Sequence, residues 1–315
     1  MSQGRDLVTV GRVSVDLYST LAHASFLEPQ NFNKSVGGSP VNVAVAAAKL
    51  GLRAAPITAV GNDPLGEYVR SSLNGCGVET GFIGIDQDGQ TPLVLASLDP
   101  PEDPEILFYR GKEAPDTKIL RSRDLDELVR TARIFWVSVG ALAVGHTATS
   151  SLAWAKSRGG ELDTALDLDY RPSLWPSKEL ARAKAQEFIE YSTIVVGNLT
   201  ECEMALGERD PEAIIESLRS RNVKLMAIKM GGEGVIMASE SDVVHIGPEK
   251  VDVVCGLGTG DAFGGAMIHG FLAGWPLRQI GEFANAAGAI VAGVLMCSEA
   301  MPTENEVVEF MKGKK

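Results

Sequence analysis

The chain has 315 residues, of which 45% are hydrophobic and 22% charged, a composition typical of globular proteins and not of disordered or membrane-spanning ones. Its 29 Lys and Arg against 41 Asp and Glu give a formal net charge of −12, which argues against nucleic acid or an anionic membrane surface as a partner. An anionic ligand must therefore be held by a few placed cations and by backbone amides. Glycine, with 34 residues, exceeds its usual share of roughly 7%.

Segments with strand and helix character alternate along the chain. Strands are predicted at residues 6–11, 54–60, 134–139, 162–169, 193–196 and 224–229. Ser39 and Pro40 are predicted to be the N-cap and first residue of a helix that Gly51 ends, and residues 64–74 form the next helix. This alternation indicates an α/β protein with a mainly parallel sheet between helices.

Two segments, at about 13–36 and 91–112, interrupt the alternation because they are short, turn-rich and without helical periodicity. We expect them to form a small antiparallel sheet that projects from the α/β body as a lid. No linker separates them from the rest, so residues 1–315 are expected to form a single domain with the lid inserted.

Neither a membrane span nor a secretory leader is expected. The apolar stretch 288–296 is far shorter than the ~20 residues that cross a bilayer. Residues 1–11 lack the apolar core of a signal peptide, which favours a cytoplasmic location. Four cysteines are too scattered for a metal finger or redox motif, and we expect them to be reduced and buried: Cys76, Cys202, Cys255 and Cys297.

The segment 254–275 combines a glycine-rich loop with the start of a helix. Gly256, Gly258 and Gly260 lead into a helix that begins near Asp261. Glycines let a backbone approach a ligand, and the free amides of a helix N-terminus stabilise an anion. A carboxylate there would repel a phosphate unless it accepts a proton from an attacking hydroxyl. The alternative is an ordinary acidic residue that complements the helix dipole.

Two further glycine clusters are ambiguous when taken alone. Gly37 and Gly38, followed by Asn42, fit either a tight turn into a helix or a site that faces a polyhydroxyl ligand. Residues 229–234, with the sequence KMGGEG, fit either a hairpin turn or a loop over a nucleotide.

Five motifs occur along the chain in this order: Gly11–Arg12 with Asp16, Gly37–Gly38 with Asn42, Asn198 with Glu201, Lys229 with its glycine loop, and Gly258 to Asp261. In combination, they resemble the ribokinase-type (PfkB) carbohydrate kinases from about Leu7 to about Phe310. The resemblance implies a ribokinase-like three-layer α/β/α sandwich with a mainly parallel central sheet and a small β lid. It also implies ATP and Mg²⁺ as cofactors and transfer of the γ-phosphate to a sugar hydroxyl.

The resemblance assigns Asp261 as the catalytic base, a role that fits a carboxylate receiving the hydroxyl proton in phosphoryl transfer. Gly258, Thr259 and Gly260 match the anion hole, where the family usually has Ala in place of Thr259. Substrate contacts are implied for Arg12, Asp16, Gly37, Gly38 and Asn42.

Nucleotide contacts are implied for Asn198, Lys229, Gly231, Gly232, Gly234, Gly260 and Asn285. Glu201 completes an Asn-x-x-Glu motif and is expected to hold Mg²⁺ through water, although an exposed carboxylate in a first helical turn is the alternative. Cys255 stands where many family members have an Asp of a monovalent-cation site, and Met296 stands near a usual glycine. These departures make potassium activation doubtful.

Two arginines favour an acidic substrate. Arg110 follows Tyr109, while Asp169 and Arg171 alternate at a strand end and so face one side. One such arginine alone is more simply a surface or ion-paired residue, but two can clamp a carboxylate. Tyr109, Arg110, Asp169 and Arg171 are therefore candidate substrate-binding residues.

Local segments such as GGSPVNVAV and LDLDYRPSLW resemble the 5-dehydro-2-deoxygluconokinase subgroup, which acts on a sugar acid of myo-inositol catabolism. The 2-keto-3-deoxygluconate kinases are the first alternative, and neutral-sugar kinases such as fructokinase are the second. A catalytically silent sensor on the same fold is disfavoured by an intact Asp261, and a nicotinamide oxidoreductase by the lack of an early GxGxxG. The expected partners are a small sugar acid and ATP. The exposed edge of the lid sheet is expected either to pair across a homodimer or to be covered in another way.

Overall fold

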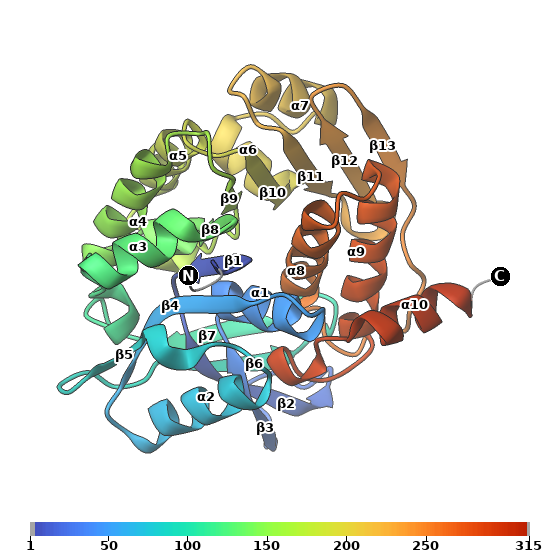
Figure 1. Ribbon diagram of the computed structural model, residues 1–315. Helices are drawn as coiled ribbons and strands as arrows, with labels where there is room; N and C mark the ends of the chain where they lie inside the picture. The colour runs from blue at the N-terminus through green and yellow to red at the C-terminus, as the bar shows by residue number, and fades with distance from the viewer. Residues whose placement is uncertain (1–3, 314–315) are drawn as a thin grey trace.

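The computed structural model describes residues 4–313. The first three residues of the segment 1–11, in which no signal peptide is expected, lie outside the described residues. A nine-stranded sheet crosses the molecule in the order β13-β12-β11-β10-β9-β8-β1-β4-β5 (Figure 1). Its strands are β1 (Leu7–Val10), β4 (Ala54–Gly61), β5 (Ile83–Asp86), β8 (Ile134–Ser138), β9 (Thr164–Asp167), β10 (Ile194–Asn198), β11 (Leu225–Lys229), β12 (Val235–Ser239) and β13 (Val243–Ile246). All neighbours from β5 to β11 are parallel, and only β12 runs in the opposite direction, so that its pairs with β11 and β13 are antiparallel.

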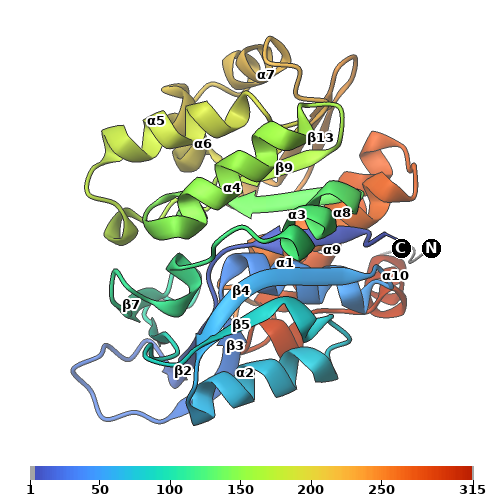
Figure 2. The same ribbon diagram turned by 60° about the vertical axis from the view of Figure 1, so that its left-hand side comes forward.

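Helices cover both faces of this sheet, as Figures 1 and 2 show. One face packs against α1 (Ser39–Lys49), α8 (Thr259–Leu272), α9 (Leu277–Ala292) and α10 (Glu304–Lys312), and α2 (Pro64–Gly75) adds to the same core. The other face packs against α3 (Arg123–Thr131), α4 (Gly145–Arg158), α5 (Lys178–Ile189), α6 (Leu199–Leu206) and α7 (Pro211–Arg219). Because both faces are covered, strands such as β1 are buried along their whole length. The expected three-layer sandwich with a mainly parallel sheet is confirmed.

A second, four-stranded sheet contains β2 (Ser14–Ala22), β3 (Phe32–Gly37), β6 (Leu93–Leu98) and β7 (Glu105–Tyr109), in the order β3-β2-β6-β7. All four strands lie within the two interrupting segments. The expectation of a purely antiparallel sheet is wrong, because β2 and β6 pair in parallel while the outer pairs are antiparallel. The reason is connectivity: the chain leaves this sheet after β3, builds α1, β4, α2 and β5, and only then returns as β6.

The start of α1 also differs from the prediction. Its N-cap is Gly38, with φ 104°, and Ser39 is already the first helical residue. A side chain at residue 38 would overlap the carbonyl of Arg12, and the positive φ favours glycine. The Ser39 hydroxyl is thereby free to donate to Asp167 instead of capping the helix.

No helix among residues 4–313 combines the length and hydropathy that a bilayer crossing requires.

Candidate active site

A cavity of about 220 Å³ lies at the carboxyl ends of the parallel strands, between the two sheets and the N-terminus of α8. This is the edge at which open α/β sheets bind ligands, because the loops leave the strands there. Side chains that follow β1, β9, β10 and β11 meet those of the second sheet across the cavity. They include Arg12, Asp16, Asn42, Asp167, Asp169, Arg171, Asn198, Glu201, Lys229 and Asp261.

The glycine loop before α8 forms one wall of this cavity. Gly258 is the N-cap with φ 82°, and a Cβ there would contact Cys297 Sγ at 2.7 Å, so glycine suits both the backbone and the space. The first amides of α8, at Thr259 and Gly260, have no acceptor within the helix and are available to an anion. The Thr259 hydroxyl donates to the Gly256 carbonyl at 2.9 Å, so it stabilises its own loop and leaves its amide unused.

Asp261 lies half-buried in the first turn of α8 and borders the cavity. Its Oδ2 accepts a hydrogen bond of 2.8 Å from Asn42 Nδ2 on α1. Burial raises the pKa of Asp261 to about 6, and the negative charge of Asp169 acts in the same direction. A carboxyl group with this pKa is deprotonated at neutral pH and still basic enough to accept a proton.

The second sheet contributes Asp16, which is buried and accepts one hydrogen bond at each carboxylate oxygen. Ser14 Oγ donates to its Oδ1 at 2.6 Å and Tyr18 OH donates to its Oδ2 at 3.1 Å. Burial raises the pKa of Asp16 to about 6. Gly37 lies directly against this carboxylate, where any Cβ would overlap it. The predicted substrate residue Asp16 therefore depends on the small size of Gly37.

Two arginines meet at Asp169 on the far side of the cavity. Arg12 Nη2 donates to Asp169 Oδ2 at 2.6 Å, and Arg171 Nε donates to Oδ1 at 3.0 Å. Burial alone would raise the pKa of Asp169, but the two guanidinium groups lower it below the usual value. The carboxylate thus holds both arginines in place as one charged group.

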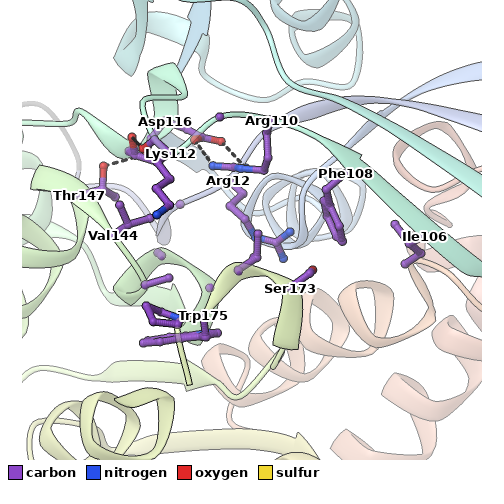
Figure 3. Close-up of a pocket in the computed structure, with 18 of the residues that line it drawn as sticks. Arg12, Ile106, Phe108, Arg110, Lys112, Asp116, Val144, Thr147, Ser173 and Trp175 are labelled. Carbon is purple, nitrogen blue, oxygen red and sulfur yellow. Dashed lines mark hydrogen bonds and ion pairs between the residues drawn. The ribbon is translucent and has the colours of Figure 1, made fainter. Parts of the chain in front are cut away.

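Tyr109 and Arg110 lie outside this cavity. Arg110 donates from both terminal nitrogens to the buried Asp116, at 2.5 and 3.2 Å, and lines a neighbouring cavity of about 700 Å³ (Figure 3). Tyr109 is 61% exposed and lines another hollow. The structure therefore brings Arg12 and Arg171 together, and does not bring Arg110 beside Arg171.

The neighbouring cavity in Figure 3 shares only Arg12, Ile106 and Phe108 with the first one. Trp175 forms part of its wall, and the Thr147 hydroxyl donates to the Asp116 carbonyl beside it. The Arg12 guanidinium lies over the Phe108 ring, with 5.8 Å from Cζ to the ring centroid. Arg12 and Phe108 therefore separate the two cavities.

A third cavity, of about 490 Å³, adjoins the first on the other side of the α8 N-terminus. The two share Asn198, Lys229, Gly256, Thr259 and Gly260. The remaining predicted nucleotide residues, Gly231, Gly232, Gly234 and Asn285, all line the third cavity. Asn285 Nδ2 donates to the Gly247 carbonyl at 2.9 Å. All the predicted nucleotide residues thus line the third cavity, which shares five lining residues with the cavity of Asp261.

Lys229, at the end of β11, is the cation at the junction of these two cavities. Burial alone would lower the pKa of Lys229, but the surrounding carboxylates, led by Glu201 and Asp167, raise it. The ammonium group is therefore charged and close to the anion-binding amides, since a Cβ on Gly260 would lie 3.0 Å from Lys229 Nζ.

Asn198 and Glu201 form a capping box at the start of α6. Asn198 Oδ1 accepts from the Glu201 amide at 2.9 Å, and Glu201 Oε2 accepts from the Asn198 amide at 2.7 Å. Glu201 is buried, which differs from the exposed alternative, and it borders the same cavity as Asp167. Sequence reasoning gave Asp167 no role, although its spacing from Asp169 indicated a shared face.

These oxygen donors fit Mg²⁺. Burial raises the pKa of Asp167 to about 7, so a cation placed beside it would favour its ionised form. No group of three His, Cys, Asp or Glu within residues 4–313 is close enough to enclose a metal. The donors therefore suit an ion that keeps water and phosphate ligands, as Mg²⁺ does. Bound there, the ion would supply positive charge to the phosphates.

The residues around Cys255 do not fit a monovalent cation. Cys255 packs with Tyr18, Cys297 and flanking leucines in a small apolar cluster. The amides of Val254 and Cys255 both donate to the Ala292 carbonyl, at 2.8 and 3.2 Å, so this oxygen already has protein partners. A monovalent cation needs oxygen ligands, whereas here apolar packing and backbone hydrogen bonds surround the loop at Cys255.

Comparison with known proteins agrees with this geometry. The model of the pfkB family carbohydrate kinases matches residues 5–304. The 5-dehydro-2-deoxygluconokinase of Geobacillus thermodenitrificans is 30% identical over 98% of this chain and 93% of the relative, and that of Geobacillus kaustophilus is 31% identical with the same coverage.

Solved structures share the fold. A candidate ribokinase II from E. coli, in complex with ATP and Mg²⁺, superimposes with a TM-score of 0.87 at 21% identity, covering 98% of this chain and 99% of the other. Fructokinase with bound ATP from Xylella fastidiosa gives 0.85 at 22% identity and the same coverage. The chain belongs to the pfkB family of carbohydrate kinases and is an ATP-dependent sugar kinase.

Proposed function

We propose that this kinase phosphorylates a sugar acid, 5-dehydro-2-deoxygluconate, as a step of myo-inositol catabolism. The observation that carries the proposal is the group formed by Arg12, Asp169 and Arg171 at the end of the cavity. The curated relatives named 5-dehydro-2-deoxygluconokinase, at about 30% identity over 98% of the chain, support the same substrate.

The charge of this group favours a carboxylate ligand. Two guanidinium groups share one carboxylate, which leaves a net positive charge at a largely buried place. Among the described residues, the terminal nitrogens of Arg171 donate no hydrogen bond to a protein group, and its side chain is 41% exposed and lines the cavity. Guanidinium nitrogens in this state bind a carboxylate well. A neutral sugar would form no charge-assisted hydrogen bond of this kind with the free guanidinium nitrogens.

The rest of the cavity then carries out phosphoryl transfer. Asp261 accepts the proton of the sugar hydroxyl while the hydroxyl oxygen forms a bond to the γ-phosphorus and the bond to the bridging oxygen of ADP breaks. The amides of Thr259 and Gly260 and the ammonium group of Lys229 stabilise the charge of the transferred group. Asp16 and Asn42 hold the sugar hydroxyls, since carboxylate and amide groups both pair with OH.

The Asp261→Asn variant tests the base. We expect turnover to fall about 10²- to 10⁴-fold, because the amide cannot accept the proton. The fold and ATP affinity should persist, since Asn is nearly isosteric and the anion-binding amides are unchanged. A coupled assay of ADP release measures turnover, and calorimetry measures ATP binding. Turnover close to that of the wild type would refute the assignment.

The raised pKa of Asp261 predicts the pH dependence of the reaction. As pH falls through about 6 the carboxyl group becomes protonated and cannot act as a base, so kcat/KM should fall on the acid side of about pH 6. The residual activity of Asp261→Asn should lack this decrease. A decrease that persists in Asp261→Asn would instead point to Asp16 or Asp167, whose pKa values are also raised.

The Arg171→Ala variant tests the acidic substrate. Loss of a charge-assisted hydrogen bond should raise KM for 5-dehydro-2-deoxygluconate about 10- to 100-fold, with KM for ATP unchanged. The exposed Arg123→Ala on α3 is the matched control. The panel should include 2-keto-3-deoxygluconate and fructose. Preference for fructose, unaffected by Arg171→Ala, would reject the sugar-acid proposal, and preference for 2-keto-3-deoxygluconate would reassign the acid.

The cluster around Cys255 predicts turnover without a monovalent cation. Rates in potassium chloride and in choline chloride of equal ionic strength should agree, because protein contacts already hold the loop before α8. Clear stimulation by potassium would contradict this prediction.

A further inference from the structure

A short hydrogen-bonded chain leads from Asp261 to a residue that no sequence motif indicated. Asn42 Nδ2 donates to Asp261 Oδ2 at 2.8 Å, and Ser298 Oγ donates to Asn42 Oδ1 at 2.7 Å. Ser298 and Asn42 are both buried. The three residues come from α8, α1 and the 3₁₀ turn Ser298–Ala300 after α9.

The chain fixes which end of the Asn42 amide faces the base. A side-chain amide can present either its NH₂ group or its oxygen, and only its partners decide between the two. The ionised carboxylate of Asp261 only accepts, so it takes the NH₂ group, and the Ser298 hydroxyl donates to the amide oxygen at the other end and holds the side chain in that orientation. The opposite orientation would place an oxygen against a carboxylate.

The turn that carries Ser298 is itself held by the second sheet and by α2. Glu299 accepts hydrogen bonds from the Ser35 hydroxyl on β3 and from the Tyr68 hydroxyl on α2, the latter at 3.2 Å. Lys34 Nζ lies 3.7 Å from the centroid of the Tyr68 ring. These contacts tie the turn that carries Ser298 to β3 and α2.

We propose that Ser298 is a positioning residue for catalysis, which acts through Asn42 by orienting its amide toward the base Asp261. The inference rests on the proposed role of Asp261. Its effect on rate runs through the hydrogen bond to Asn42, because Ser298 makes no hydrogen bond to Asp261 itself among the described residues.

Asp261 lies among several charged groups. The groups that face Asp261 from the surrounding elements are Asp167, Asp169, Arg171, Lys229 and the thiol of Cys297. Since the Asn42 hydrogen bond lowers the pKa of Asp261 against the effect of burial, loss of the fixed amide should raise that pKa.

The test is a double-mutant cycle between Ser298→Ala and Asn42→Ala, assayed for kcat/KM and its pH profile with the acceptor that supports the fastest turnover. Ser298→Ala alone should lower kcat/KM about tenfold, as expected for a buried amide that has lost its partner. It should also move the acid-side decrease to higher pH. In the Asn42→Ala background, Ser298→Ala should have no further effect on kcat/KM.

Ser192→Ala is the matched control, since it removes another buried serine hydroxyl that donates to a carbonyl, far from the cavity. It should leave kcat/KM and the pH profile unchanged. Equal losses from Ser298→Ala in both backgrounds, or an unshifted pH profile, would overturn the role of Ser298. Retention of turnover by Asp261→Asn would instead overturn the base, and the two failures are therefore distinguishable. Thermal unfolding of each variant separates loss of fold from loss of rate.

Discussion

The catalytic cavity depends on the balance of charge at one edge of the sheet. Carboxylates outnumber the three cations Arg12, Arg171 and Lys229 among its lining residues. Burial raises the pKa values of Asp16, Asp167 and Asp261, whereas Asp169 stays ionised between two arginines. A phosphate would add negative charge to this excess, so its binding requires a counter-ion. The carboxylates that line the cavity thus favour a divalent cation such as Mg²⁺ beside a bound phosphate.

The second sheet does not only cover the cavity; it also contacts the segments that surround Asp261. Its strand β2 supplies Asp16, and its strand β3 holds Glu299, the neighbour of Ser298. The loop before β7 also reaches the α8 N-terminus, because the Gly256 amide donates to the Pro101 carbonyl at 2.8 Å. A displacement of this sheet would therefore disturb both the sugar contacts and the amide that faces Asp261. We infer that substrate contacts and base geometry are set by one continuous network.

The sequence predicted the parts of the site that depend on backbone, and missed the parts that depend on long-range partners. The glycines before Asp261 indicate a local turn, and such a turn depends only on residues that are neighbours in sequence. Arg110 fits a carboxylate clamp by its neighbours in sequence, but the buried Asp116 six residues later binds both of its terminal nitrogens. Ser298 belongs to no sequence motif, because its contact with Asn42 joins residues that are far apart in the chain. The parallel pairing of β2 and β6 was hidden for the same reason, because many residues separate the two strands.

Asp261, the third residue of α8, differs in its contacts from the acidic residues that cap two other helices of this chain. Asp63 and Asp210 cap α2 and α7 by accepting hydrogen bonds from the amides of Gly66 and Ala213. Backbone amides outweigh burial at Asp63 and lower its pKa, as expected for a structural cap. Asp261 accepts from Asn42 instead, and its pKa is raised. Asp261 therefore does not cap its own helix, and the first amides of α8 stay available to an anion. This favours the catalytic interpretation of Asp261 over the structural one.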